Sequence, residues 1–261
     1  MSAASVQTPR WWLSLLAMRW KPSKDLMAVA VSWLLVVGAL YSATVVGPNA
    51  AGGLAYFALY AILAATVFGL GIPLYWTVAI RKRPISELGL TTRRIWLSLG
   101  LQVVFAALQF FGAYRDLKIP ALAELIPLVA LSLAIAFFEA VFWRGWVLFR
   151  LEDAFGLLPA ILVGSALYAA YHIGYGMPFS EISFLFVIGL MYAIAFRLTG
   201  SVFILWPIFQ PMGQLVTLMR DGLPLPLLAA LGFFEVLIVM WVLVWLAARS
   251  YKKATQKLAG A

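Results

Sequence analysis

Five polar side chains interrupt apolar stretches of this sequence, and their types could support hydrolytic chemistry. Glu139 and Arg144 lie in one apolar stretch, and His172 lies in the next. Gln210 and Gln214 follow in a third, four residues apart and so on one face of a helix. A carboxylate and an imidazole together can orient and deprotonate a water molecule, and amide groups can donate to a developing oxyanion. These residue types, if they meet, are those of a hydrolase.

The stretches that carry these residues are apolar enough to cross a membrane. Of the 261 residues, 64% are hydrophobic and only 11% are charged, a composition that no soluble domain requires. We expect an all-α polytopic membrane protein with about eight transmembrane helices in a single bundle, in contact with the lipid bilayer. Pro127 suits a first helical turn and is expected to begin the fourth span. The expected spans are residues 26–46, 54–80, 95–114, 127–152, 157–176, 181–196, 200–219 and 226–248.

The chain is expected to form one transmembrane domain with short polar ends. Residues 1–25 are a cytoplasmic or interfacial segment, residues 26–248 the transmembrane domain, and residues 249–261 a basic cytoplasmic tail. With the N-terminus in the cytoplasm, 16 of the 19 lysines and arginines fall on the cytoplasmic side, as the positive-inside rule requires. We therefore expect both termini in the cytoplasm and the protein in a bacterial plasma (inner) membrane. The same asymmetry explains the net charge of +9, so a nucleic-acid partner is not expected.

Several polar residues are expected to lie at one depth in the membrane. A helix rises about 1.5 Å per residue, and Glu139 and His172 each lie about 20 Å from the cytoplasmic ends of their spans. Gln214 and Glu235 reach the same depth in the last two spans. Common depth does not fix a common direction. The glutamines could be hydrogen-bonding glue between helices, His172 a packing residue, and Glu235 a partner of Arg144 or of a tyrosine.

Arg144 lies five residues from Glu139, which is more than one α-helical turn. We expect its guanidinium to be buried against a carboxylate or against carbonyl groups at a helix end. In that position Arg144 would lock the cytoplasmic half of its span and would not touch the reacting group.

The amino-acid composition argues against a zinc site. The chain has no cysteine and one histidine. Zinc sites use histidine, cysteine and carboxylate ligands, so a multi-histidine site is excluded. We therefore expect no metal and no other cofactor.

Two motifs around these residues resemble those of the CPBP family, which comprises CAAX proteases and bacteriocin-processing enzymes and is also called the Abi family. Glu139-Ala140-x-x-x-Arg144 resembles the family's E-E-x-x-x-R motif. Tyr168-x-x-x-His172 resembles its F-x-x-x-H motif. The two motifs stand in the family's order and spacing.

Two further stretches extend the resemblance. Gln210-x-x-x-Gln214 resembles the family's third motif, which is normally H-x-x-x-N or H-x-x-x-D. Residues 87–90 resemble the short E/D-L-G-L stretch that often precedes the core. The similarity covers roughly residues 84–220.

The resemblance implies an eight-helix intramembrane endopeptidase. The family's first glutamate and its F-x-x-x-H histidine act on the hydrolytic water, and they correspond to Glu139 and His172. The third motif supplies either metal ligands or oxyanion donors. Here it reads Gln210 and Gln214, which argues against zinc and leaves a metal-free mechanism with amide donors. Three further residues are expected to support the site: Arg144, Tyr168 and Glu235.

Three functions remain open at this point. Ala140 replaces the family's second glutamate, and the changed third motif also fits a member that binds without cutting. The protein is either a protease that cuts a peptide or membrane-protein substrate, or a pseudoprotease. A pseudoprotease would act as a scaffold or chaperone that holds a partner's transmembrane helix. A third alternative is a protein that binds a lipid or isoprenoid in the same cavity.

Overall fold

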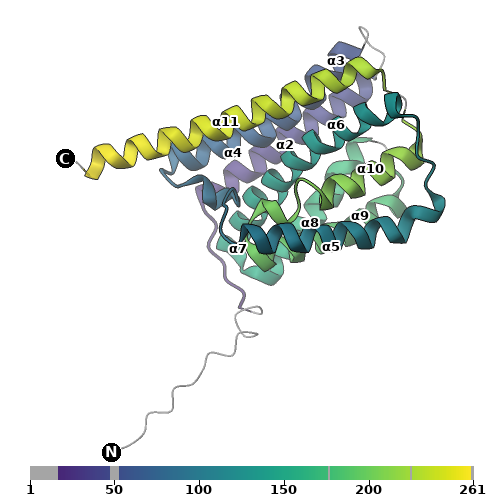
Figure 1. The fold of residues 1–261 in the computed structure, drawn as a ribbon. Coiled ribbons are helices and arrows are strands. Elements are labelled where there is room, and N and C mark those ends of the chain that lie inside the picture. The colour runs from purple at the N-terminus through teal and green to yellow at the C-terminus, as the bar shows by residue number, and fades with distance from the viewer. Residues whose placement is uncertain (1–16, 48–52, 176, 224, 260–261) are drawn as a thin grey trace, which may run out of the picture.

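The computed structural model describes residues 17–47, 53–175, 177–223 and 225–259, and these residues form helices joined by short loops, without a strand. The helices pack side by side in one bundle (Figure 1). In chain order the elements are α2 (Lys24–Val46), α3 (Leu54–Phe57), the π-helix η2 (Ala58–Gly71), α4 (Ile72–Tyr75), the π-helix η3 (Trp76–Ile80), the 3₁₀ turn η4 (Ile85–Leu88), α5 (Ile95–Ala113), the 3₁₀ turn η5 (Tyr114–Asp116), α6 (Leu122–Glu139), the π-helix η6 (Ala140–Leu148), α7 (Phe149–Phe155), α8 (Leu157–Ala170), the 3₁₀ turn η7 (Tyr171–Tyr175), α9 (Phe179–Thr199), the 3₁₀ turn η8 (Val202–Ile204), α10 (Phe209–Asp221) and α11 (Leu227–Ala259).

Six of the described helices are long and apolar enough to cross a membrane, which confirms the predicted all-α polytopic bundle. A seventh apolar helix, Leu157–Ile173, is shorter. The helix α10 has only 13 residues. These two short helices stand where the fifth and seventh spans were predicted. The six long helices are Lys24–Val46, Leu54–Ile80, Ile95–Ala113, Leu122–Phe155, Phe179–Thr199 and Leu227–Gln256.

The seventh predicted span, residues 200–219, is an α-helix over only part of its length. Gly200 ends α9 with a φ of 69°, a left-handed conformation that glycine adopts without strain. The hydroxyl of Ser201 then accepts a hydrogen bond from the backbone N–H of Phe203 and starts a 3₁₀ turn. Pro207 has no N–H to donate, and α10 begins only at Phe209. The third motif therefore starts in the first turn of a short helix.

The fourth predicted span begins earlier than expected. Its helix starts at Leu122 rather than at Pro127, and it continues through α6, η6 and α7 to Phe155, a run of 34 residues. Pro127 lies inside α6 and removes one backbone hydrogen bond. Packing outweighs this loss, because 78% of the most apolar stretch of the helix is buried.

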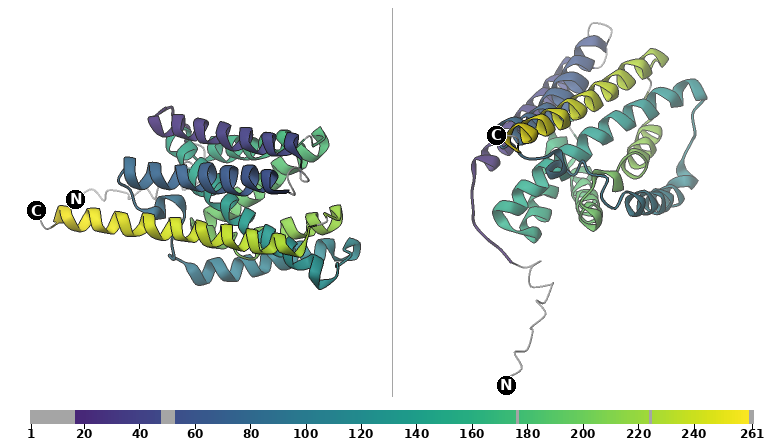
Figure 2. Two further views of the ribbon diagram at one scale, coloured as in Figure 1. Left: turned by 90° about the horizontal axis from the view of Figure 1, so that it is seen from above. Right: turned by 60° about the vertical axis from the view of Figure 1, so that its left-hand side comes forward.

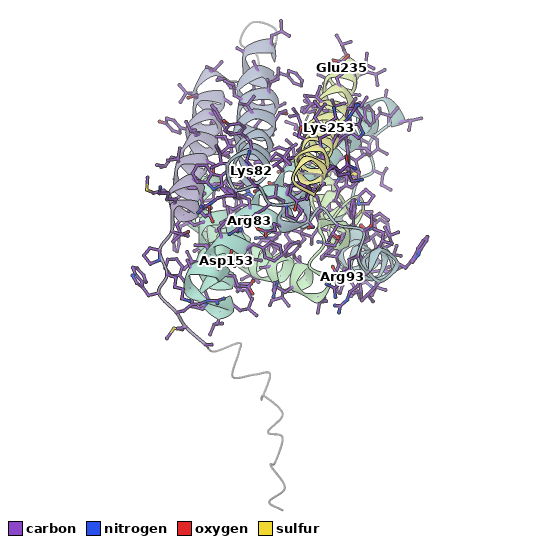
Figure 3. All side chains as sticks on the ribbon, turned by 90° about the vertical axis from the view of Figure 1, so that its left-hand side faces the viewer. Lys82, Arg83, Arg93, Asp153, Glu235 and Lys253 are labelled. Carbon is purple, nitrogen blue, oxygen red and sulfur yellow. The ribbon has the colours of Figure 1, made fainter. Side chains whose placement is uncertain are left out.

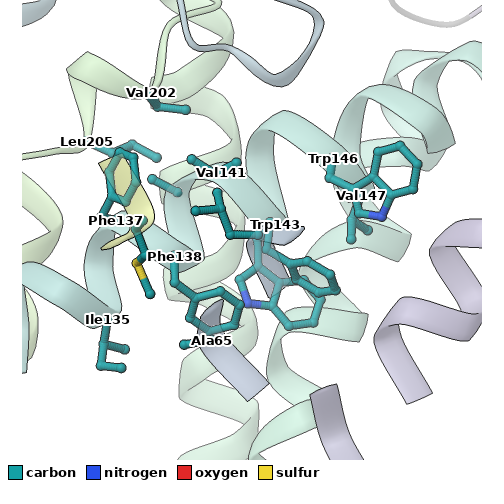
Figure 4. Packing of buried hydrophobic residues seen from close by; sticks show 14 of the residues in the cluster. Ala65, Ile135, Phe137, Phe138, Val141, Trp143, Trp146, Val147, Val202 and Leu205 are labelled. Carbon is teal, nitrogen blue, oxygen red and sulfur yellow. The ribbon is translucent and has the colours of Figure 1, made fainter. Parts of the chain in front are cut away.

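The helix that carries Glu139 is the core of the bundle. Figure 4 shows Phe137 and Phe138 of this helix among the buried residues. The Phe137 ring stacks on Trp241 of α11 with 4.7 Å between the ring centroids. Gly69 of η2 gives room to Phe138, because a Cβ at position 69 would lie 2.1 Å from its ring. Close packing on both sides therefore fixes the backbone that precedes Glu139.

Ion pairs gather at one end of the bundle. Glu87 of η4 accepts a hydrogen bond from Arg150 of α7 at 3.0 Å, and Glu152 of α7 forms an ion pair with Arg197 of α9 at 3.1 Å. Figure 3 looks onto this end, with Lys253 of α11 toward the viewer. The C-terminal part of α11 projects beyond the other helices on the same side (Figures 1 and 2). One end of the bundle is thus highly charged.

Candidate functional site

The carboxylate of Glu139 lies in the centre of the bundle and accepts three hydrogen bonds. The hydroxyl of Tyr171 donates to its Oε1 atom. The side-chain amides of Gln210 and Gln214 donate to its Oε2 atom at 2.7 and 2.9 Å. Only 3% of the Glu139 surface is exposed. Hydrogen bonds to a carboxylate favour its charged form, so these donors offset part of the cost of burying a charge in the membrane.

Three separate elements position these groups. Glu139 ends α6, where the backbone passes into the π-helix η6. Gln210 and Gln214 lie one turn apart on α10, which packs on α6. Tyr171 lies at the end of α8, where the helix tightens into the 3₁₀ turn η7. The depth that the sequence predicted for these glutamines thus corresponds to a real contact with Glu139.

His172 packs against Tyr171, the residue that donates to this carboxylate. The centroids of the two rings are 4.0 Å apart. The Nδ1 atom of His172 lies 3.0 Å from the carbonyl oxygen of Tyr168, whose ring is 5.3 Å from the imidazole. His172 is 8% exposed. The imidazole therefore packs on the tyrosine that donates to Glu139.

Tyr171 is the site residue that sequence reasoning missed. It directly precedes His172 and lies at the same depth, which was the available signal. In a regular helix, neighbouring residues point about 100° apart, so adjacency alone did not place its hydroxyl on Glu139. The 3₁₀ turn that begins at Tyr171 changes the direction of the following side chains.

The surroundings of Arg144 differ from the prediction. The guanidinium is buried, with 1% of the residue exposed, but no carboxylate in the described part of the chain lies within 4.0 Å of its nitrogens. Its carbon Cζ lies over the rings of Tyr168 and Tyr192, at 4.9 and 5.9 Å from their centroids. Cation–π contacts thus replace the expected ion pair.

The helix changes type between Glu139 and Arg144, because the π-helix η6 begins directly after Glu139 and contains Arg144. Hydrogen bonds in a π-helix run between residues five apart. Five residues therefore correspond to about one turn of η6, and Arg144 lies about one such turn beyond Glu139. Among the described residues no hydrogen bond or ion pair joins Arg144 to Glu139, so the expectation that Arg144 does not touch the reacting group stays a prediction.

Glu235 does not join the site. It lies on the outer side of α11, where its side chain is exposed (Figure 3). Among the described residues, no hydrogen bond or ion pair connects it to Glu139 or Arg144. The depth of Glu235 in the membrane was predicted by treating its span as a straight helix. Depth does not fix the direction of a side chain, and the face of α11 that carries Glu235 points away from α6. The described residues also hold no group of three His, Cys, Asp or Glu side chains placed to bind a metal ion.

Comparison with known families agrees with the motifs. Residues 121–209 match the family described as type II CAAX prenyl endopeptidase Rce1-like. The chain has no significant match among curated proteins or among solved structures. The matched segment contains Glu139, Arg144 and His172 and ends one residue before Gln210. In this integral membrane protein, residues 121–209 are therefore similar to the Rce1-like family of CAAX proteases, in agreement with the CPBP resemblance that its motifs indicate.

Proposed function

We propose that the protein is an intramembrane endopeptidase in which Glu139 is the general base for a water molecule. The observation that carries this proposal is the buried carboxylate itself, which receives three hydrogen-bond donors in a largely apolar core. An ionisable group at membrane depth is costly and usually marks function. The Rce1-like match supplies the reaction class, namely hydrolysis of a peptide bond.

In this proposal the donors hold the base in place. Each glutamine donates one N–H to the Oε2 atom of Glu139. This contact supports a positioning role for Gln210 and Gln214 instead of the oxyanion role predicted from the sequence. Tyr171 fixes the other oxygen. His172, packed on Tyr171, is proposed to orient the same water. Because the donor set around Glu139 consists of two amides and a hydroxyl, we propose a metal-free reaction.

We propose that a cavity between α6 and α10 is the entrance for the substrate. Glu139, Gln210 and Gln214 do not line it. Its volume is about 480 Å³, and Leu128 of α6 and Leu218 of α10 are among its mostly apolar lining residues. Leu218 lies one turn beyond Gln214, which is itself partly exposed. An apolar peptide segment that enters here would pass between the two helices that carry Glu139 and its amide donors. We propose a membrane-protein or peptide substrate whose cleaved segment is apolar.

The charged end of the bundle supports the proposed orientation, with both termini in the cytoplasm of a bacterial cell. The ion pairs of η4, α7 and α9 lie at the end where the C-terminal part of α11 projects. Basic residues are retained on the cytoplasmic side of a membrane. On this orientation the cavity lined by Leu218 opens toward the outer side.

Cleavage of a fluorogenic library of membrane peptides by the purified protein tests the proposed function. The wild type is expected to cut some of these peptides. Glu139→Gln keeps the size and hydrogen bonding of the side chain but removes the base, so we expect cleavage to fall by about 10²–10⁴. A wild-type protein that cuts no peptide, or a Glu139→Gln variant with full activity, would rule the peptidase out.

One observation favours a second function, a pseudoprotease that holds a partner's transmembrane helix. Ala140 and Gln210 stand where the resembled family has a glutamate and a histidine, and the donors around Glu139 could serve structure alone. In that case Glu139→Gln would leave partner capture and cellular function intact. A pull-down with mass spectrometry, run beside the cleavage assay, separates this scaffold from the peptidase and from a protein that binds lipid.

A further inference from the structure

The guanidinium of Arg144 has hydrogen-bond donors that no described residue accepts. Its Nη1 and Nη2 atoms are both buried, and neither has a hydrogen-bond partner in the part of the chain that the structure describes. Burying a charged donor without an acceptor is unfavourable. The two tyrosine rings stabilise the charge by their faces, but a ring face does not replace an oxygen acceptor for an N–H group.

Arg150, on the same long helix, is a buried arginine whose contacts are structural, and it serves as a comparison for Arg144. Its side chain is also buried, with 3% exposed, and lies six residues beyond Arg144. Its two terminal nitrogens reach Glu87 at 3.0 Å and Asp153 at 3.2 Å. Arg150 therefore locks two elements together. Arg144, at similar burial, makes no such link.

The free donors of Arg144 border the site of Glu139. Tyr192 presents its ring to Arg144, and its hydroxyl lies against Gly213 of α10, where a Cβ would come within 2.8 Å. Gly213 lies between Gln210 and Gln214, the two donors to Glu139. Tyr192 thus contacts both the guanidinium of Arg144 and the stretch of α10 that carries the amide donors to Glu139.

The charge of Glu139 decides which acceptor fits. A ligand carboxylate would place a second negative charge beside Glu139, and like charges repel strongly where water is excluded. A peptide carbonyl is neutral when it binds and becomes negative only as it is attacked. A carbonyl oxygen is therefore the acceptor that suits the guanidinium of Arg144 near a charged Glu139.

We infer that Arg144 binds the carbonyl oxygen of the peptide bond to be cut and holds the oxyanion that forms there, an inference that rests on the proposed function. Glu139 takes a proton from water and becomes neutral. The water oxygen forms a bond to the carbonyl carbon, and the π electrons move to the carbonyl oxygen beside Arg144. Negative charge thus moves from Glu139 to the oxyanion, and the net charge of the site does not change.

The test compares Arg144→Met and Arg144→Lys with Arg150→Met as a matched control, each in lipid nanodiscs. The substrate is the library peptide that the wild type cuts best, and the analogue is its difluoromethylene ketone, whose hydrate is tetrahedral. Arg144→Met should lower kcat by about 10²–10³ with little change in KM, as for the loss of an oxyanion donor. Arg144→Lys should keep part of the activity. Affinity for the analogue should fall by the same factor as kcat/KM.

Melting temperatures give a reading that does not depend on turnover. Arg144→Met should not lower the Tm, because it removes a charge without stranding a carboxylate, whereas Arg150→Met should lower it and keep kcat. Unchanged kcat in Arg144→Met, or a fall in Tm as large as that of Arg150→Met, would overturn the inference. If the wild type cuts nothing, the proposed function fails. The Tm comparison then still decides whether Arg144 is held for structure or left free for a ligand.

Discussion

At the residue scale, the site depends on how one carboxylate is held. Glu139 receives donors on both oxygens from two different elements, α10 and the end of α8. A general base must lie within hydrogen-bonding reach of its water in a fixed orientation. Three donors restrict the rotation of the carboxylate, and they also favour its charged form, which opposes the effect of burial away from water. The same contacts that stabilise the buried charge therefore prepare it to act.

The contact from Tyr171 gives a prediction on activity. Tyr171→Phe removes the donor to Oε1 but keeps the ring that packs on His172. A hydrogen bond to a charged group contributes about 1.5–3 kcal/mol, so kcat is expected to fall roughly 10- to 100-fold with little change in KM. Steady-state cleavage of the best library peptide measures the effect.

Tyr168→Phe is the matched control for this prediction. It keeps the ring that faces Arg144 and leaves the bonds to Glu139 in place. Its kcat is expected to remain close to that of the wild type. A loss as large in Tyr168→Phe as in Tyr171→Phe would show that packing of the tyrosine cluster, rather than the bond to Glu139, sets the rate.

The sequence predicted the depth of the site residues better than their directions. Helical rise placed Gln214 near the level of Glu139, and the two side chains are in contact. Direction depends on the local helix type, which hydrophobicity does not report. The guanidinium of Arg144 lies over the rings of Tyr168 and Tyr192, and Glu235 lies on the exposed face of α11.

At the element scale, the long apolar helices were predictable because length and composition decide them. The bounds of the elements that proline and glycine interrupt could not be predicted from length and composition. Pro127 lies inside α6 because burial of the central helix outweighs one lost hydrogen bond. Residues 201–208 fold as a turn because Ser201 caps it and Pro207 cannot extend a helix upstream. These local choices determine where α10 starts, and thus how its glutamines face Glu139.

The contact between α8 and α9 gives a prediction on stability. Gly189 of α9 lies against Ser165 of α8, where a Cβ would come within 3.0 Å of the serine Cβ. Gly189→Leu should push the helices apart and lower the free energy of unfolding by about 1–3 kcal/mol, as overpacking does. Thermal unfolding in detergent measures this.

Gly100→Leu is the matched control for the overpacking prediction. Gly100 is exposed on α5, and a Cβ there would meet nothing within 4 Å. The expected change in Tm is small, because a leucine at this position adds no clash. Equal losses in both variants would mean that replacing a helical glycine, and not the contact with Ser165, causes the effect.

At the scale of the whole molecule, the arrangement of charge predicts how the bundle lies in the membrane. The ion pairs that join η4, α7 and α9 lie at one end, together with the projecting end of α11 (Figure 3). The basic residues that the sequence assigns to the cytoplasm include those of this end. The positive-inside rule then predicts that this end lies in the cytoplasm and that the turn between α10 and α11 lies on the other side.

Because the chain has no cysteine, single-cysteine variants test this orientation directly. Asp221 ends α10 and Lys253 lies near the end of α11, and both side chains are exposed. A maleimide that cannot cross membranes should label Asp221→Cys in intact spheroplasts. It should label Lys253→Cys only after the membrane is permeabilised, because α11 separates the two positions by a full crossing. Labelling of Lys253→Cys in intact spheroplasts would contradict the orientation. It would also place the cavity lined by Leu218 on the cytoplasmic side, so that a substrate would have to approach Glu139 from within the cell.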